Sequence, residues 1–384
     1  MKEKFLSTLL AITAIFAIVF YAINCRPAWS PDSKKVAYIY SDKIGDEEFS
    51  GIAIYDLEKN ENQSILEIKK SNKEDIFPYE VFWIKGGKEI IYVLGPTDEK
   101  TSQTVTISRY NLKTKERKKI CETMMPEISA GKSLVFPVTL EKGRWLWISD
   151  GKMFRRLDIK TGKRQEFRDR DFIAFGSEKK VAFVEKFKDD KIVFGKIKDL
   201  FFYKEAPLFS IPIEAGAGEI LPILAIPTKK IQFAYIKEVE EGYSLTVLDS
   251  QGKVVKEIAL PDTISFDKDS SIMFASAVWD SNGESLWLPV EVLDENGEKY
   301  NAITEVNIIN GSVSLIKFED KNYKSKATPF YLSLSPDEKY LASEVMLEEG
   351  GVHLGLVDLT AKERKVTFIH HPATISQKSG STKK

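Results

Sequence analysis

Short apolar runs alternate with polar turns along almost the whole chain, and no long amphipathic helical stretch interrupts them. Residues 36–40 are apolar on both faces, as expected for a strand packed between neighbouring sheets. We therefore predict a first unit of four strands, at residues 27–29, 36–40, 52–57 and 63–68. A polar loop is predicted at residues 41–50, and a hairpin turn at residues 58–62.

One motif recurs along the chain: a hydrophobic or aromatic residue, a small polar turn and then a strand. The clearest copies are Trp29-Ser30-Pro31-Asp32 and Leu334-Ser335-Pro336-Asp337, and degenerate copies begin at Trp83, Ser129, Phe175, Ile226 and Trp279. In such a turn proline presets φ, and aspartate bonds the backbone two residues on. About seven units of roughly 45–55 residues lie near the upper end of the repeat length of propeller blades. The sequence therefore predicts an all-β propeller of seven four-stranded blades, with six or eight as alternatives.

The Trp29-Ser30-Pro31-Asp32 copy and the strand after it resemble the repeat of TolB-like propellers, also called the WD40-like PD repeat, of the form W-S-P-D-G-x-x-I-A-F. Two copies match well, and all copies together span roughly residues 27–369. Ser33 and Glu338 replace the usual glycine. The family includes periplasmic scaffold proteins and the propeller domains of prolyl oligopeptidase-like peptidases. The resemblance thus implies a fold rather than a reaction, with structural repeat residues at Trp29, Pro31, Asp32, Trp83, Trp279, Pro336 and Asp337.

The N-terminus has a different composition from the repeats. Residues 5–23 form an apolar run long enough to cross a bilayer as a helix, and Lys2 and Lys4 precede it. We predict a membrane anchor, with a cleaved signal peptide, a buried core helix and lipidation of Cys25 as alternatives. The expected organisation is an anchor or signal segment at residues 1–26, a propeller at 27–370 and a disordered polar tail at 371–384.

A search for chemistry assigns no catalytic residue, cofactor or metal. No G-x-S-x-G elbow is present, the three histidines are His353, His370 and His371, and no Cys/His spacing resembles a zinc site. Residues 267–271 and 294–297 resemble calcium loops but lack a distal bidentate glutamate. Carboxylates on channel loops could still act without histidine, with Asp46, Glu141 and Asp294 as candidates.

Charge is distributed unevenly between the two predicted faces of the ring. The loops between second and third strands are acidic, and their candidate binding residues are Asp46, Glu47, Glu48, Asp189, Asp190, Glu240, Glu241, Asp294, Glu295, Glu348 and Glu349. The turns on the opposite face are basic, for example at Lys34, Lys160 and Arg117. An acidic face can steer the approach of a partner, although solubility alone would also explain these charges.

The sequence favours an extracytoplasmic, membrane-anchored propeller that binds or scaffolds a protein partner in the cell envelope. The net charge of −1 and the absence of a basic groove do not favour nucleic acid as a partner. One alternative is a hydrolase or lyase that acts on polysaccharide or peptide through channel-facing carboxylates, and another is a small-ligand sensor. Convergent buried carboxylates would favour the enzyme, and a smooth acidic or aromatic rim the binding module.

Overall fold

The computed structural model describes residues 26–44, 47–69, 76–84, 86–96, 104–124, 140–141, 145–149, 154–167, 172–177, 180–188, 191–194, 209–212, 220–223, 229–230, 232–266, 276–318, 327–348 and 350–369. All regular secondary structure in these ranges is β-strand. None of the described residues belongs to a helix that could span a membrane. The predicted anchor at residues 5–23 and the predicted tail at 371–384 lie outside the described residues.

Consecutive strands pair antiparallel in groups of four. The N-terminal half of the chain forms the groups β1 (Ala28–Trp29), β2 (Lys35–Ile44), β3 (Glu47–Asp56), β4 (Glu61–Lys69); β5 (Ile76–Trp83), β6 (Glu89–Pro96), β7 (Thr104–Asn111), β8 (Arg117–Met124); and β9 (Leu140–Glu141), β10 (Trp145–Ser149), β11 (Phe154–Asp158), β12 (Arg164–Phe167).

The C-terminal half continues the same pattern. Its groups are β13 (Phe172–Ser177), β14 (Lys180–Lys188), β15 (Lys191–Phe194), β16 (Phe209–Pro212); β17 (Ile220–Ile223), β18 (Phe233–Val239), β19 (Gly242–Leu248), β20 (Val254–Ala259); β22 (Val278–Trp279), β23 (Ser285–Leu293), β24 (Lys299–Asn307), β25 (Val313–Phe318); and β26 (Ala327–Leu334), β27 (Tyr340–Leu347), β28 (Val352–Asp358), β29 (Lys365–Ile369). An additional short strand, β21 (Ile264–Ser265), also pairs with β23.

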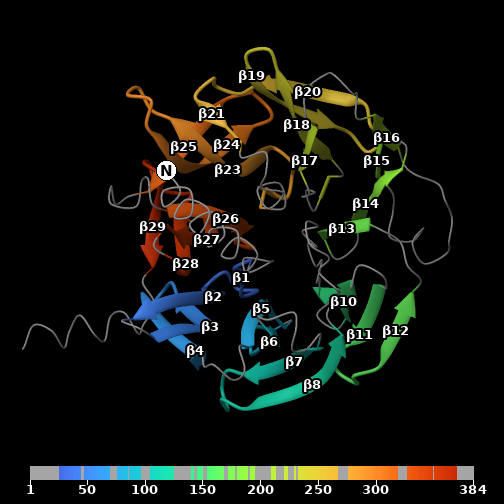
Figure 1. The fold of residues 1–384 in the computed structure, drawn as a ribbon, viewed down its shortest axis with the longest axis vertical. Helices are drawn as coiled ribbons and strands as arrows, with labels where there is room; N and C mark the ends of the chain where they lie inside the picture. Colours follow the sequence, from blue (N-terminus) through green and yellow to red (C-terminus); the bar gives the residue numbers. More distant parts are fainter. Residues whose placement is uncertain are drawn as a thin grey trace, which may run out of the picture.

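The groups follow one another around a ring, and the first group lies beside the last (Figure 1). A bridge between Ser41 and Val352 joins β2 to β28, and β25 and β29 pair in parallel at Lys317↔Lys365. Within the described residues each terminal group is built from its own end of the chain. In this part of the chain, lateral contacts join the first group to the last.

The repeat tryptophans link one group to the next. The indole Nε1 of Trp83 donates to the carbonyl of Ala28 at 2.8 Å, and that of Trp29 donates to the carbonyl of Ser333 at 2.9 Å. Each acceptor lies one residue before the equivalent repeat position of the preceding group. Trp29 and Trp83 are each 8% exposed, so their indoles both fill the space between two sheets and satisfy a backbone carbonyl there.

The two Ser-Pro-Asp turns have the same internal geometry. Ser30 Oγ donates to Asp32 at 2.6 Å and accepts from the Lys35 backbone, and Ser335 does the same with Asp337 and Tyr340. The bond from Ser30 is the main cause of the lowered pKa of Asp32. At Asp337 partial burial acts in the opposite direction, and the bonds from Ser335, the Lys339 backbone and Ser33, together with the charge of Lys339, outweigh it and lower the pKa. The serine and aspartate thus fix the turn before each second strand.

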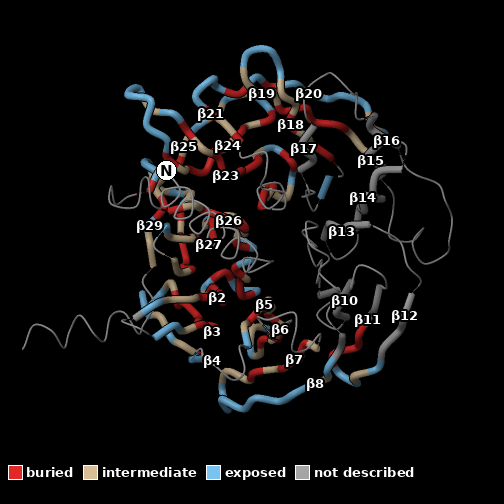
Figure 2. The backbone as a smooth tube through the Cα atoms, in the orientation of Figure 1, coloured by how far each residue is buried: buried red, intermediate tan, exposed pale blue. Residues whose placement is uncertain are grey.

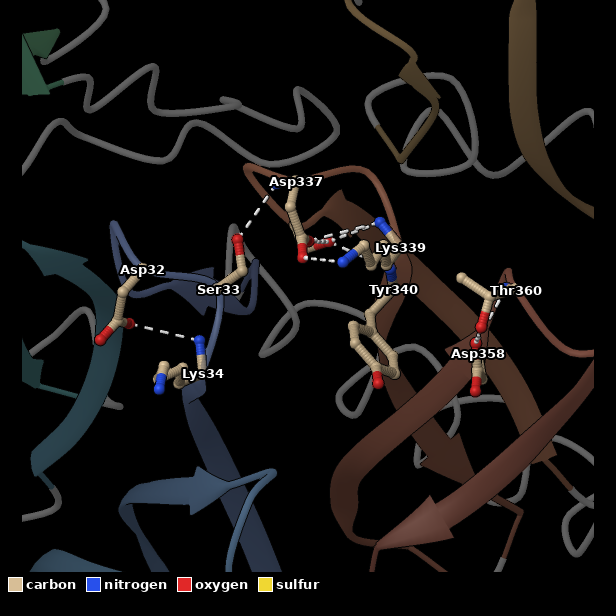
Figure 3. A network of polar contacts seen from close by, with 9 residues as sticks. Asp32, Ser33, Lys34, Asp337, Lys339, Tyr340, Asp358 and Thr360 are labelled. Carbon is tan, nitrogen blue, oxygen red and sulfur yellow. Dashed lines mark hydrogen bonds and ion pairs between the residues drawn. The ribbon is translucent and has the colours of Figure 1, made fainter.

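Neighbouring turns also bond to one another at the closure (Figure 3). The backbone N–H of Asp337 donates to Ser33 Oγ at 3.0 Å, across a sequence separation of 304 residues. In the next interface the N–H of Ser281 donates to Glu338 Oε1 at 2.9 Å. The turns of three consecutive groups are therefore connected through Ser33 and Glu338, which stand where TolB-like repeats have glycine.

The core consists of apolar residues between the sheets, whereas the turns are exposed (Figure 2). Large and small residues alternate across paired strands: Tyr38 faces Ala53, and Tyr40 faces Gly51. Tyr40 crosses the glycine to donate to the carbonyl of Leu66 at 3.3 Å. A Cβ at position 51 would collide with that ring, so the glycine is required by this close approach.

One prediction about local structure was wrong. Residues 41–50 are not a loop, because β2 and β3 stay paired through Ser41↔Ser50 and Lys43↔Glu48 along the hairpin. Cross-strand pairing of opposite charges and the half-buried Phe49 compensate for the polar composition there.

Candidate functional site

Three polar residues occupy equivalent places on neighbouring groups. Arg26, Glu80 and Tyr331 each lie three residues before the repeat position, which is Trp29, Trp83 or Leu334. Glu80 and Tyr331 belong to β5 and β26, the first strands of their groups, and Arg26 directly precedes β1. Arg26 interacts electrostatically with both of the other residues. The ring thus brings together a cation, a carboxyl and a phenol from three consecutive groups.

Irregular backbone accompanies two of these residues. The register of β5 against β6 shifts between Pro78 and Glu80, and that of β26 against β27 shifts between Phe330 and Ser333. Tyr331 lies within the second bulge at a φ of +46°, where bulky residues are outliers. Bulges re-aim side chains and are over-represented beside active sites, and strained backbone concentrates at functional sites.

Glu344 of β27 completes the set, which we call the inner cluster: Arg26, Glu80, Tyr331 and Glu344. Glu344 is 2% exposed, and neither of its side-chain oxygens has a hydrogen-bond partner among the described residues. It pairs with Leu354 in register, so its side chain lies on the sheet face that packs against the β1–β4 group. Its charge raises the pKa of Glu80, which places the two carboxyls near each other.

Electrostatics within the inner cluster are strongly perturbed. Burial raises the pKa of the Glu344 carboxyl well above its ordinary value. Burial also raises the pKa of Glu80, with Arg26 opposing and Glu344 reinforcing the effect. Burial lowers the pKa of the Arg26 guanidinium, although the residue keeps exposed surface.

The arrangement offers one guanidinium and two carboxyls with raised pKa values to a bound molecule. Burial raises the pKa of both Glu80 and Glu344, and at Glu80 the charge of Arg26 opposes this effect. Buried polar groups almost always have hydrogen-bond partners, so the two unpartnered oxygens of Glu344 require an explanation. Perturbed carboxyls beside a charged residue are typical of binding and catalytic sites.

The predicted acidic face is partly described. Glu47, Glu48, Glu240, Glu241, Glu295 and Glu348 are exposed at the hairpins between second and third strands, and Asp294 is half-buried at one of them. Asp46, Asp189, Asp190 and Glu349 lie outside the described residues. We call the six exposed glutamates the hairpin rim.

Some of these acids have structural partners. Glu47 pairs with Lys69 across the hairpin. Asp294 Oδ1 accepts from the backbone of Asn296 at 2.9 Å and of Glu298 at 3.0 Å, which makes it the cap of its own turn rather than a loop carboxylate open to a ligand. The side chain of Glu141, the third candidate channel carboxylate, is outside the described side chains.

The basic face is less uniform than its composition indicates. Lys34 and Lys35 pair with Glu58 and Asp56, so carboxylates neutralise part of the charge of these turns. Arg117 is not a turn residue at all: it begins β8 and donates to the carbonyl of Ile65 at 2.5 Å, which ties two groups together. Its replacement would therefore disturb packing as well as surface charge.

His353 and Cys121 take ordinary positions. His353 is the second residue of β28, buried at 5% exposure beside the Phe368 ring. Cys121 is half-buried in β8. His370 and His371 lie outside the described residues. The described part of the chain contains no group of three His, Cys, Asp or Glu residues that could hold a metal.

The inner cluster was not predicted from the sequence. A signal was present, because Glu80 and Glu344 are lone carboxylates within otherwise apolar strands. Counting three residues back from each repeat position would also have aligned Arg26, Glu80 and Tyr331. The proximity of Glu344 to that row depends on the sheet register, which the sequence did not indicate.

Comparison with known proteins supports the architecture. Oligogalacturonate lyase from Vibrio parahaemolyticus is similar over 89% of this chain and 90% of its own, with a TM-score of 0.51 and 12% identity. The chain with the sequence above therefore has the β-propeller fold. A 6-phosphogluconolactonase-like protein from Bacteroides uniformis matches 88% of this propeller and 96% of its own chain, with a TM-score of 0.50 and 14% identity.

A propeller that is not named as an enzyme matches with a comparable TM-score. The β-propeller domain of Cps50 from Myceliophteria thermophila covers 86% of this chain and 96% of its own, with a TM-score of 0.50 and 9% identity. No protein-family model and no curated protein matches the sequence. At these identities the similarity establishes the fold and leaves the function to the residues themselves.

Proposed function

We propose that this protein is a seven-bladed propeller of the TolB-like type whose inner cluster binds a small ligand. The strand groups of the described residues support the blade number, and the matching geometry of the two Ser-Pro-Asp turns supports the family. The observation that carries the ligand proposal is Glu344, a buried carboxyl with two unpartnered oxygens near Glu80, which in turn interacts with Arg26. Pockets of this kind use a few convergent polar groups to orient a bound molecule.

Ligand binding can be tested by thermal unfolding of the full-length protein against a panel of small amines, sugar acids and neutral sugars. A ligand that binds only the folded protein raises the unfolding temperature by mass action. The rise should disappear in Glu80→Gln and in Glu344→Gln and should persist in Glu257→Gln, an exposed carboxylate on β20. A panel without any stabilising compound, or stabilisation untouched by both inner variants, would refute this function.

A second candidate is protein binding at the hairpin rim in the cell envelope. It is favoured by the exposed glutamates that recur at the hairpins of separate blades. Reversing Glu240 and Glu241 to lysine should weaken capture of an envelope partner and reduce its salt dependence. Lys113→Glu with Lys115→Glu is the matched control on the opposite face, because Arg117 takes part in packing. Equal capture by wild type and both variants would leave solubility as the explanation of the rim.

The location proposed for this module is the extracytoplasmic side of a membrane, anchored through residues 5–23. The apolar run and the lysines before it support this placement. Fractionation of the full chain should place it with membranes, and protease added from outside the cytoplasmic membrane should digest the propeller. Recovery of the full chain in the cytoplasmic fraction would contradict the placement.

A further inference from the structure

The surroundings of Glu344 restrict what a ligand can be. Its side chain shares a sheet face with Leu354 and faces the apolar surface of the β1–β4 blade. The titratable groups on the elements around it are Glu80 on β5, Arg26 before β1, Tyr331 on β26, and Tyr38 and Tyr40 on β2.

Neither tyrosine of β2 ionises within the physiological range. Tyr38 accepts from Asn62, and Tyr40 donates to Leu66. Burial raises the pKa of the Tyr40 hydroxyl to about 12 and that of Tyr38 higher still. His353, on the neighbouring β28, pairs in register with Val345 and therefore lies on the opposite face of the sheet.

The charges of the inner cluster leave one carboxyl without an opposite charge. The cluster contains two carboxyls, Glu80 and Glu344, and one guanidinium, Arg26, so one ionised carboxyl would lack a counter-charge. A bound anion would stabilise Arg26 but would lie beside two carboxyls, which repel it unless both are protonated. A bound cation with N–H donors would instead satisfy the orphaned oxygens and leave the whole cluster neutral.

We propose that the inner cluster binds an organic cation, and that Glu344 accepts hydrogen bonds from the ligand's ammonium or guanidinium group. This inference rests on the proposed ligand-binding function and names the class of ligand. When the cation binds, Glu344 gives its proton to solvent, so one proton leaves for each ligand that enters. Arg26 keeps exposed surface next to Glu80, which gives solvent access to the cluster.

The proposal is tested with three probes of the same shape: butylammonium, butanol and butyrate. The full-length protein is titrated with each probe by calorimetry at constant ionic strength, with potassium chloride as the inorganic comparison. Butylammonium should bind, and its affinity should rise by up to about tenfold per pH unit while the free protein holds the Glu344 proton. Repeating the titration in buffers of different ionisation heat should report about one proton released per ligand.

Variants separate Glu344 from the rest of the surface. Glu344→Gln should abolish both binding and proton release, and Glu257→Gln should change neither. Proton release by the wild-type protein does not depend on a variant, so the inference can be refuted even if Glu344→Gln fails to fold. Equal heat from potassium chloride, or butylammonium binding without proton release, would overturn it.

The outcomes also separate this inference from the proposed function. Binding of butyrate or butanol that is lost in Glu344→Gln would refute the organic cation but retain a ligand site. If no probe binds and no compound of the wider panel stabilises the protein, both proposals are refuted. Binding of butylammonium that survives in Glu344→Gln would place the cation elsewhere and overturn the inference.

Discussion

Two residues of the Ser-Pro-Asp turns adopt a conformation that usually requires glycine. Ser33 has a φ of +61° and Glu338 a φ of +60°, at the position where the similar TolB-like repeat has glycine. A non-glycine residue in this left-handed region costs roughly 1–2 kcal/mol. Each side chain compensates with a bond to the neighbouring turn: Ser33 Oγ to the Asp337 backbone and Glu338 Oε1 to the Ser281 backbone.

These opposing contributions predict different effects of alanine and glycine. A hydrogen bond of this kind contributes about 0.5–1.5 kcal/mol net. Ser33→Ala loses the bond and keeps the strained backbone, so the free energy of unfolding should fall by about 1 kcal/mol. Ser33→Gly loses the same bond but relieves the strain, and should remain within about 0.5 kcal/mol of wild type.

The measurement is urea unfolding of the full-length protein followed by tryptophan fluorescence, with the midpoint compared at unchanged slope. Glu338→Ala and Glu338→Gly repeat the comparison at the next interface, where Glu338→Gln keeps an acceptor and serves as the control. Hydrogen exchange of the 335–338 segment should accelerate in both Ser33 variants, because the Asp337 N–H loses its partner.

Two results would contradict this reasoning. If Ser33→Gly is destabilised as much as Ser33→Ala, the left-handed backbone carries no cost at this turn. If Ser33→Ala is as stable as wild type and exchange at residues 335–338 is unchanged, the bond that closes the ring contributes nothing.

Three further predictions concern the core. A carboxyl whose pKa is raised on folding favours the fold at low pH, so stability should fall as pH rises above 4.5, and Glu344→Gln should reduce this loss in urea midpoints measured up to pH 8. Gly51→Ala should cost about 2 kcal/mol, because its methyl group meets the facing tyrosine ring; an unchanged midpoint would disprove the clash. Trp83→Phe should cost about 1 kcal/mol more than Trp287→Phe, because only the Trp83 indole gives up a bond, to Ala28, and equal losses would count against it.

The repeat motif predicted much of the fold because its physical requirements are local. Proline and aspartate in the turn act within a few residues, so Pro31 and Asp32 mark the start of β2 directly. Short apolar runs between polar turns located most strands of the first unit. This signal failed at residues 41–50, where the hairpin is held by pairing between β2 and β3 rather than by apolar side chains.

The candidate site was less predictable because it depends on contacts between blades. Exposed acids at hairpins follow from the order of the strands, and the sequence assigned Glu240 and Glu348 to the correct hairpins. The order of the strands did not indicate the position of Glu344, since its proximity to Glu80 follows from the packing of separate sheets. The inter-blade role of the Trp83 indole likewise depends on a neighbour 55 residues away.

Energetically unfavourable residues of two kinds occur in this propeller, and the difference between them bears on function. At Ser33 and Glu338 an unfavourable backbone is accompanied by a bond that joins two blades, so the structure itself explains why the residue is there. In the inner cluster Tyr331 is strained and Glu344 is buried without a partner in the described chain. Apolar residues of similar volume at buried charged positions are often equally or more stabilising, so stability does not account for these two residues. A ligand that supplies the missing donors would account for Glu344, and a bulge that aims Tyr331 at the same place would account for the strain.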